Sequence, residues 1–224
     1  MSVLLDDYYV EFRSEEKLAS FALEWRREAG NENFARFNIV RFVEDVLLKK
    51  LTRRRFGIKF FDAADGEKQG YVTFNPRTLH IDREVWRLAD LGEPEARFIV
   101  AHEVGHIILH DHEAKAFSSD PSLRIKFGEP EHSAEWQANT FAYHFLLPSH
   151  LVAGFKAGAR ELAASAQVSE HLAMERQQSV HEATRFVRLR EAEICSACGN
   201  LTLTSDGECL SEACSLRSAV PSVS

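Results

Sequence analysis

The peptide Ala-His-Glu-Val-Gly-His occupies residues 101–106, inside an apolar run that predicts a single helix. Two histidines four residues apart lie on one helical face, about 6 Å apart along the axis, so His102 and His106 can bind the same metal ion. Glu103 lies beside the first histidine, where it can act as general base towards water and then as proton donor to a leaving amine. Polar groups inside an apolar helix are costly to bury unless a partner such as a metal ion compensates. The motif therefore predicts a metal site of the zinc-peptidase type.

A zinc site of this type needs a third protein ligand and leaves its fourth position open for water. Four nearby residues offer a suitable side chain: His110, His112, Glu131 and Glu135. On a continuing helix, His110 lies about 12 Å along the axis from His102. Ligands of one zinc ion sit only about 2 Å from it, so His110 is expected outside the ligand set.

The spacing of His112 is that of a metzincin, in which the chain turns sharply at a glycine seven residues after the first histidine. Leu109 occupies that position, and the backbone conformation of such a turn is sterically unfavourable for leucine. The remaining route is a glutamate from a second helix, predicted over residues 131–147 between two prolines. Glu131 lies at its N-terminal end, where the helix dipole favours a carboxylate for reasons unrelated to metal. Glu135, at the edge of the apolar face, is therefore the preferred third ligand.

Three segments together resemble a known family of enzymes. Residues 97–106 read Arg-Phe-Ile-Val-Ala-His-Glu-Val-Gly-His, residues 135–142 read Glu-x-x-Ala-Asn-x-Phe-Ala, and residues 146–148 read Leu-Leu-Pro. In this order and at this separation they resemble the ImmA/IrrE metallopeptidases, far more specifically than the histidine motif does alone. The resemblance covers roughly residues 10–190.

Carried over to this chain, the resemblance implies that His102, His106 and Glu135 bind one catalytic Zn²⁺ and that Glu103 is the catalytic base. It implies a zinc metalloendopeptidase that cleaves a protein substrate, namely a helix-turn-helix transcriptional repressor, in a stress or mobile-element response. The alternative is a non-catalytic regulatory or toxin–antitoxin component that uses the zinc core as a binding scaffold. An intact Glu103 argues against this alternative, because a purely structural site has no need of a base.

Hydrophobic periodicity ahead of the motif predicts helices over residues 14–29 and 38–51, followed by strands over residues 56–61, 71–74 and 78–82. The predicted fold class is therefore α+β, with a gluzincin-like zinc-peptidase core of helices plus a small antiparallel sheet. Such a sheet commonly lies beside the motif helix, and its edge strand can pair with an extended substrate.

The core is assigned to residues 1–157, followed by a helical extension over residues 158–190 that resembles a helix-turn-helix. Glu170 and Glu175 lie in its second helix, which makes that helix poor at binding phosphates. The chain as a whole carries a net charge of −7, which argues against a general nucleic-acid binder. Direct nucleic-acid binding is therefore not expected, and the extension is interpreted as a packing or partner-recognition element.

All four cysteines lie beyond this extension: Cys195, Cys198, Cys209 and Cys214. Their spacing, two residues within the first pair and four within the second, is within the range of structural zinc sites. So short a segment has no core of its own and would need the metal to fold. We therefore expect a zinc-ribbon-like module with a second, structural Zn²⁺ over residues 191–215, and a disordered tail over residues 216–224.

A length of 224 residues, 45% of them hydrophobic, suffices to bury one core domain with a small appendage. No apolar run approaches the roughly 18 residues that a membrane span requires. The N-terminus has no basic flank before an apolar segment, and the core contains no cysteine that could form a disulfide framework. A cytoplasmic protein without a membrane partner is expected.

Overall fold

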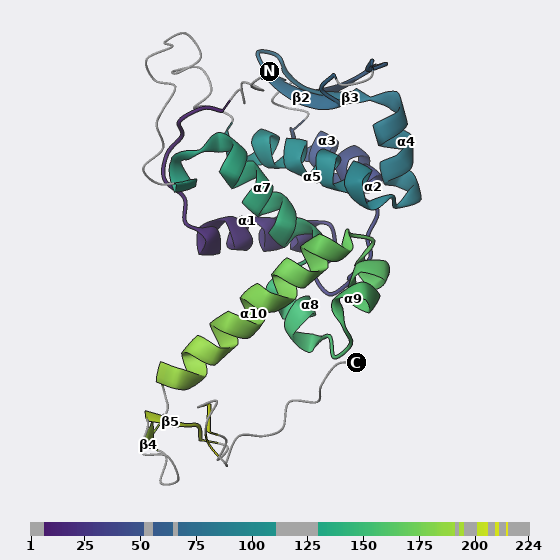
Figure 1. Cartoon of the computed structure of the whole chain (residues 1–224). Coiled ribbons are helices and arrows are strands. Elements are labelled where there is room, and N and C mark those ends of the chain that lie inside the picture. The colour runs from purple at the N-terminus through teal and green to yellow at the C-terminus, as the bar shows by residue number, and fades with distance from the viewer. Residues whose placement is uncertain are drawn as a thin grey trace.

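The computed structural model describes residues 7–51, 56–64, 67–110, 130–190, 193–194, 201–205, 209–210 and 214. Its architecture is α+β: a body of packed helices carries a small three-stranded sheet on one side, and a long helix extends from the opposite side (Figure 1). The predicted α+β class is confirmed.

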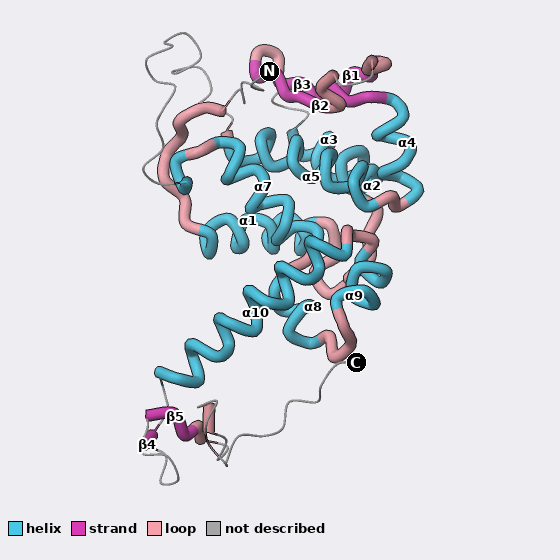
Figure 2. Tube along the Cα trace, viewed as in Figure 1, coloured by secondary structure: helices cyan, strands magenta, loops and turns pink. Residues whose placement is uncertain are grey.

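Two helices form the centre of the fold. Helix α5 (Pro94–Leu109) carries the histidine motif, and helix α7 (Ala134–Leu146) packs against it (Figure 2). Glu93 caps the start of α5, and Pro94 suits the first turn because the missing N–H there would have no helical partner. Helix α1 (Glu15–Glu28) packs against α7 in turn.

The two central helices touch at a glycine. A Cβ atom on Gly105 would lie 3.1 Å from both the Cα atom and the carbonyl oxygen of Ala138. These are backbone atoms of α7, which cannot move aside as the end of a flexible side chain could. Gly105 and the small Ala138 therefore set the distance between α5 and α7.

The sheet consists of β1 (Gly57–Phe61), β2 (Gly70–Phe74) and β3 (Arg77–Asp82), in the order β1-β3-β2. Strands β2 and β3 form an antiparallel pair, as predicted, but β1 runs parallel to β3. The prediction of an entirely antiparallel sheet is therefore wrong for one of the two pairings.

Burial explains why β3 takes both neighbours. Leu79 and Ile81 of β3 are fully buried, whereas neither β1 nor β2 has a buried residue. Strand β1 pairs with the edge of β3 that β2 does not occupy. It runs parallel to β3 there. Strand β2 is thereby left at the sheet edge, where it contacts α5.

The second predicted helix contains a π-helical turn. It runs through α2 (Ile39–Arg41), the π-helical segment η1 (Phe42–Leu47) and α3 (Leu48–Leu51) without a break. The side chain of Asn38 caps its start. Helix α4 (Arg83–Leu91) then connects β3 to the start of α5.

Three helices follow the central pair: α8 (Ser149–Gly154), α9 (Ala159–Ala166) and α10 (Glu170–Arg190). Gln167 ends α9 in the left-handed conformation, with φ of 54°. The buried guanidinium group of Arg97 on α5 donates hydrogen bonds to the carbonyl oxygens of Gln167 and of the last residue of α9. This contact ties the α9–α10 junction to the central helices, and α10 extends away from them (Figure 1).

Beyond α10, strand β4 (Glu193–Ile194) pairs with strand β5 (Leu201–Leu203) in antiparallel orientation. Cys195, Cys198 and residues 216–224 lie outside the described residues, so the zinc-ribbon-like module and the disordered tail stay predictions. Among the residues that the structure describes, no helix combines the length and the apolar character needed to cross a membrane.

The contact at Gly105 can be tested by comparing two helical glycines. Gly105→Ala should lower the free energy of unfolding by about 1–3 kcal/mol, because the added methyl group meets the α7 backbone. Gly154→Ala is the matched control, since a Cβ there meets nothing within 4 Å and should raise stability by roughly 0.5–1 kcal/mol. Chemical denaturation measures both; a Gly105→Ala protein as stable as the control would contradict the contact.

Candidate metal centre

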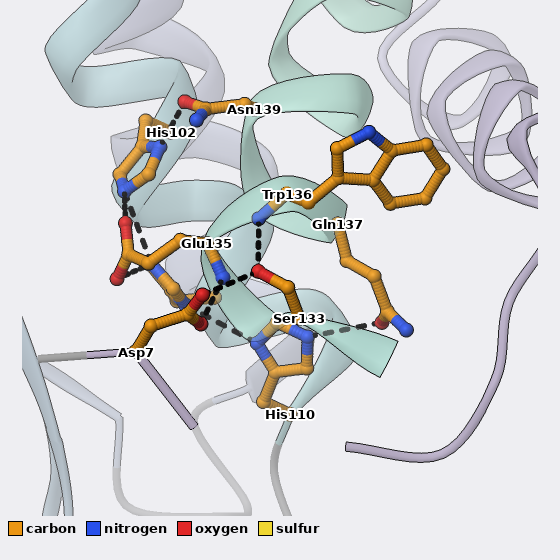
Figure 3. Close-up of polar contacts among 9 residues, drawn as sticks. Asp7, His102, His110, Ser133, Glu135, Trp136, Gln137 and Asn139 are labelled. Atoms are coloured by element: carbon orange, nitrogen blue, oxygen red, sulfur yellow. Dashed lines mark hydrogen bonds and ion pairs between the residues drawn. The ribbon is translucent and has the colours of Figure 1, made fainter. Parts of the chain in front are cut away.

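Three side chains from α5 and α7 converge on one point. The Nε2 atom of His102 lies 3.2 Å from Oε2 of Glu135 (Figure 3). The Nε2 atom of His106 lies 3.3 Å from Oε1 of the same carboxylate. The two Nε2 atoms are 3.0 Å apart. Ligands at the corners of a tetrahedron, about 2 Å from a zinc ion, are about 3.3 Å from one another. The three atoms therefore already have the spacing that zinc requires.

Asn139 fixes the orientation of His102. Its Oδ1 atom, one turn after Glu135 on α7, lies 2.8 Å from Nδ1 of His102 (Figure 3). An amide oxygen only accepts hydrogen bonds, so Nδ1 carries the proton and Nε2 directs its lone pair at Glu135. A lone pair and a carboxylate at this distance repel each other unless a cation lies between them. The donor set of two imidazole nitrogens and one carboxylate fits Zn²⁺.

The electrostatics of the cluster also favour a cation. Burial alone would raise the pKa of Glu135, but when His102 and His106 are protonated, their hydrogen bonds and charges outweigh burial and hold this pKa well below its usual value. Burial alone would lower the pKa of His102, but Glu135 and Glu103 outweigh burial and raise it. The carboxylates thus draw positive charge to the histidine nitrogens, where a proton and a metal ion compete for the same lone pairs.

Glu103 is buried beside this cluster, with 7% of its surface exposed. Burial raises the pKa of Glu103, and the charges of His106 and His102 offset only part of this effect. A carboxyl group with a raised pKa can both accept a proton and return it. A Cβ atom on Gly70 would lie 3.1 Å from Cγ of Glu103 and 3.3 Å from its Oε1. The glycine at the start of β2 therefore leaves room for the carboxyl group.

The cluster opens into a cleft with a volume of about 430 Å³. Helices α5 and α7, the edge strand β2 and the N-terminal segment all contribute to its walls. The lining includes Tyr8, Gly70, Tyr71, Phe98, Ile99 and Asn139. A metal ion held by the three converging atoms would therefore be accessible to an extended ligand that follows β2.

The N-terminal segment, residues 7–13, holds the start of α7 in place. The Asp7 carboxylate accepts a hydrogen bond from Oγ of Ser133 at 2.6 Å and one from the backbone N–H of Glu135 at 3.1 Å (Figure 3). A negative group at the N-terminus of a helix is also favoured by the helix dipole. Further backbone hydrogen bonds join the segment to the turn before α7. These contacts fix the helical turn that carries Glu135.

The structure brings the preferred ligands His102, His106 and Glu135 together and leaves the other glutamate candidate aside. Glu131 lies in the 3₁₀ turn η4 (Pro130–His132), before α7 begins, and does not belong to the cluster that could hold a metal ion. The position of Glu135 on the first turn of α7 accounts for the difference, because this turn faces the histidines of α5.

His110 lies one turn beyond His106, outside the three-atom cluster, and the Nδ1 atoms of the two rings are 3.2 Å apart. Burial lowers the pKa of His110 to about 3, so its ring is neutral at physiological pH. His112 lies outside the described residues, and no distance bears on the metzincin alternative.

Three residues around the site were not predicted from the sequence: Asp7, Gly70 and Gln137. Gln137 did carry a signal, since a buried amide within an apolar helix must find specific hydrogen-bond partners. No local pattern points to Asp7 or Gly70, because their roles depend on contacts with residues far along the chain.

Two of the four cysteines are described. Cys209 and Cys214 are buried and pack with Leu203, which forms an antiparallel bridge to Cys209. Cys195 and Cys198, their expected co-ligands, lie outside the described residues. The four-cysteine zinc site therefore stays a prediction.

The chain matches the model of a known protein family. Residues 53–184 match the family model of the M78 peptidases, which is described as the IrrE N-terminal-like domain. The match covers more than half of the chain and includes the three-stranded sheet, α5 and α7, but not residues 7–13. A search of curated proteins found no significant match.

The identity of the third ligand can be decided by zinc affinity, measured in competition with a chelating dye. Loss of an outer-shell partner typically weakens metal binding by about 10–100-fold, so Glu135→Ala, which removes a ligand, should weaken it by more than about 100-fold. Glu131→Ala is the matched control and should bind zinc as the wild type does. If His112→Ala weakens binding strongly and Glu135→Ala does not, the metzincin alternative is correct.

Proposed function

Because the chain belongs to the ImmA/IrrE family of M78 peptidases, we propose that it is a zinc-dependent endopeptidase that cleaves a protein substrate. One observation carries the proposal: the ligand atoms of His102, His106 and Glu135 converge beside the buried carboxyl group of Glu103. Family membership indicates a metallopeptidase-like function, and this cluster supplies the groups that such a function needs.

We assign the metal to His102, His106 and Glu135, with Asn139 orienting the first histidine. Two imidazole nitrogens and one carboxylate form the ligand set of catalytic zinc sites that keep one position open. When bound, zinc supplies Lewis acidity, which lowers the pKa of water and polarises the carbonyl group of the scissile peptide.

Glu103 is the proposed general base and acid. It accepts the proton that water loses on attacking the peptide carbonyl, and it then delivers this proton to the departing amine. The raised pKa of the buried carboxyl group makes its carboxylate a stronger base, which favours the first of these two steps. Gly70 of β2 lies next to this carboxyl group, and a Cβ atom at this position would be 3.3 Å from its Oε1 atom.

The substrate is proposed to bind as an extended strand along β2. Within the described part of the chain, β2 pairs with β3 alone, and residues 70–72 and Phe74 line the cleft. The outer edge of such a strand offers backbone hydrogen bonds to an incoming peptide. The resemblance to ImmA/IrrE enzymes implies a helix-turn-helix repressor as substrate, cleaved in the cytoplasm during a stress or mobile-element response.

We propose that residues 1–157 form the peptidase core, residues 158–190 a helix-turn-helix-like extension, and residues 191–215 a four-cysteine module with a second, structural zinc ion. Leu172 and Ala173, near the start of α10, are buried in the main hydrophobic core. Their burial supports a packing role for this helix over contact with nucleic acid.

The role of Glu103 can be tested by Glu103→Gln, which removes the base but keeps the side-chain shape and all three ligands. Cleavage of a purified repressor encoded beside the gene should fall by about 10²–10⁴-fold, while the zinc content stays at the wild-type level. Glu95→Gln is the matched control, since Glu95 is an exposed carboxylate on the same helix and should not affect cleavage.

Cleavage at the wild-type rate by Glu103→Gln would contradict the endopeptidase proposal. A zinc-loaded wild-type protein that binds the repressor without cleaving it would instead support the non-catalytic scaffold.

A further inference from the structure

His110 is a buried side chain that is neither a proposed metal ligand nor the proposed base. It lies one turn beyond His106 on α5, with 2% of its surface exposed, and contacts α7 through Gln137. We propose that His110 and Gln137 are positioning residues, which hold His106 in the tautomer whose Nε2 lone pair faces the metal. This inference rests on the metal site of the proposed function, but not on peptidase activity.

The hydrogen bonds of Gln137 fix the orientation of its amide group. Its Nε2 group donates hydrogen bonds to the carbonyl oxygens of Glu11 at 2.7 Å and of Glu131 at 2.6 Å. An amide has two N–H bonds, and both are used, so the side of Gln137 that faces His110 is its oxygen. This Oε1 atom lies 3.2 Å from Nε2 of His110 and also accepts a hydrogen bond from Arg13 at 2.9 Å. Nε2 of His110 must therefore carry a proton (Figure 3).

The tautomer of His110 then decides that of His106. A neutral imidazole protonated on Nε2 presents a lone pair on Nδ1. This Nδ1 lies 3.2 Å from Nδ1 of His106, which must be the donor. His106 is thus protonated on Nδ1, and its Nε2 lone pair is directed at the point shared with His102 and Glu135.

Both candidate ligand histidines are consequently held by amide oxygens of α7, by different routes. Asn139 accepts directly from His102, whereas Gln137 acts on His106 through His110. Such partners of a ligating histidine fix its ring and raise its basicity. Gln137 is in turn hydrogen-bonded to Glu11 and Arg13. Both residues lie outside the part of the chain that matches the family model.

The first test is zinc affinity, measured by competition with a chelating dye. His110→Phe keeps a buried ring but removes the acceptor for His106, and it should weaken zinc binding by about 10–100-fold. His110→Asn should restore part of the affinity, because Oδ1 of asparagine can accept where Nδ1 of histidine does. A role limited to packing would not show this rescue, since asparagine fills the space less well than phenylalanine.

The matched control is His144→Phe. His144 is also buried, with 6% exposed, but its contacts are to Glu15 and Arg176. It should lower the thermal stability of the protein and leave zinc affinity unchanged. Wild-type zinc affinity in His110→Phe would overturn the proposal, as would equal losses of affinity in His110→Phe and His144→Phe.

A second readout needs no variant. Long-range ¹H–¹⁵N correlation spectra of the zinc-loaded full chain report which nitrogen of each histidine carries the proton. We expect His110 protonated on Nε2 and His106 on Nδ1; the opposite tautomer of His110 would overturn the proposal even if His110→Phe fails to fold. If these residues do not bind zinc at all, Glu135→Ala would also leave the zinc affinity unchanged. This result distinguishes failure of the proposed metal site from failure of the proposed role of His110.

Discussion

The close packing of α5 against α7 is the contact on which the candidate site depends. Helix α5 offers two imidazoles and α7 one carboxylate, so neither helix alone holds a set of three ligands. At Gly105 and Ala138 the backbones approach so closely that an added Cβ atom would be 3.1 Å from α7. His106 is adjacent to this contact and Glu135 lies one turn before it, which explains how their side chains reach a common point.

Bringing a carboxylate and two imidazole nitrogens together inside a protein costs free energy through desolvation and repulsion. Contacts with distant parts of the chain offset this cost. Asp7 holds the backbone of the turn that carries Glu135, and Arg13 and Glu11 hold the amide of Gln137. The N-terminal segment therefore supports a site whose proposed ligands all lie within the family-matched residues. A family match alone would not have indicated its contribution.

The parts of the site that depend on local spacing could be predicted from the sequence. The helix bearing His102 and His106 follows from a four-residue spacing within an apolar run, and the preference for Glu135 follows from its place on a second helix. The order of the sheet could not be predicted, because the pairing of β1 with β3 depends on which strand is most buried. An amide in an apolar helix marks Gln137 as a residue that needs hydrogen-bond partners, but the partners themselves could not be predicted, since they come from residues 11–13 and from α5.

We propose that α5 and α7 together bind one zinc ion through two histidines and a glutamate. A crystal structure of the zinc-loaded chain, with anomalous scattering recorded at the zinc absorption edge, tests it most directly. We expect a peak about 2 Å from Nε2 of His102, Nε2 of His106 and a carboxylate oxygen of Glu135. A zinc-loaded crystal with no peak between the two helices, or with His112 bound in place of Glu135, would contradict it.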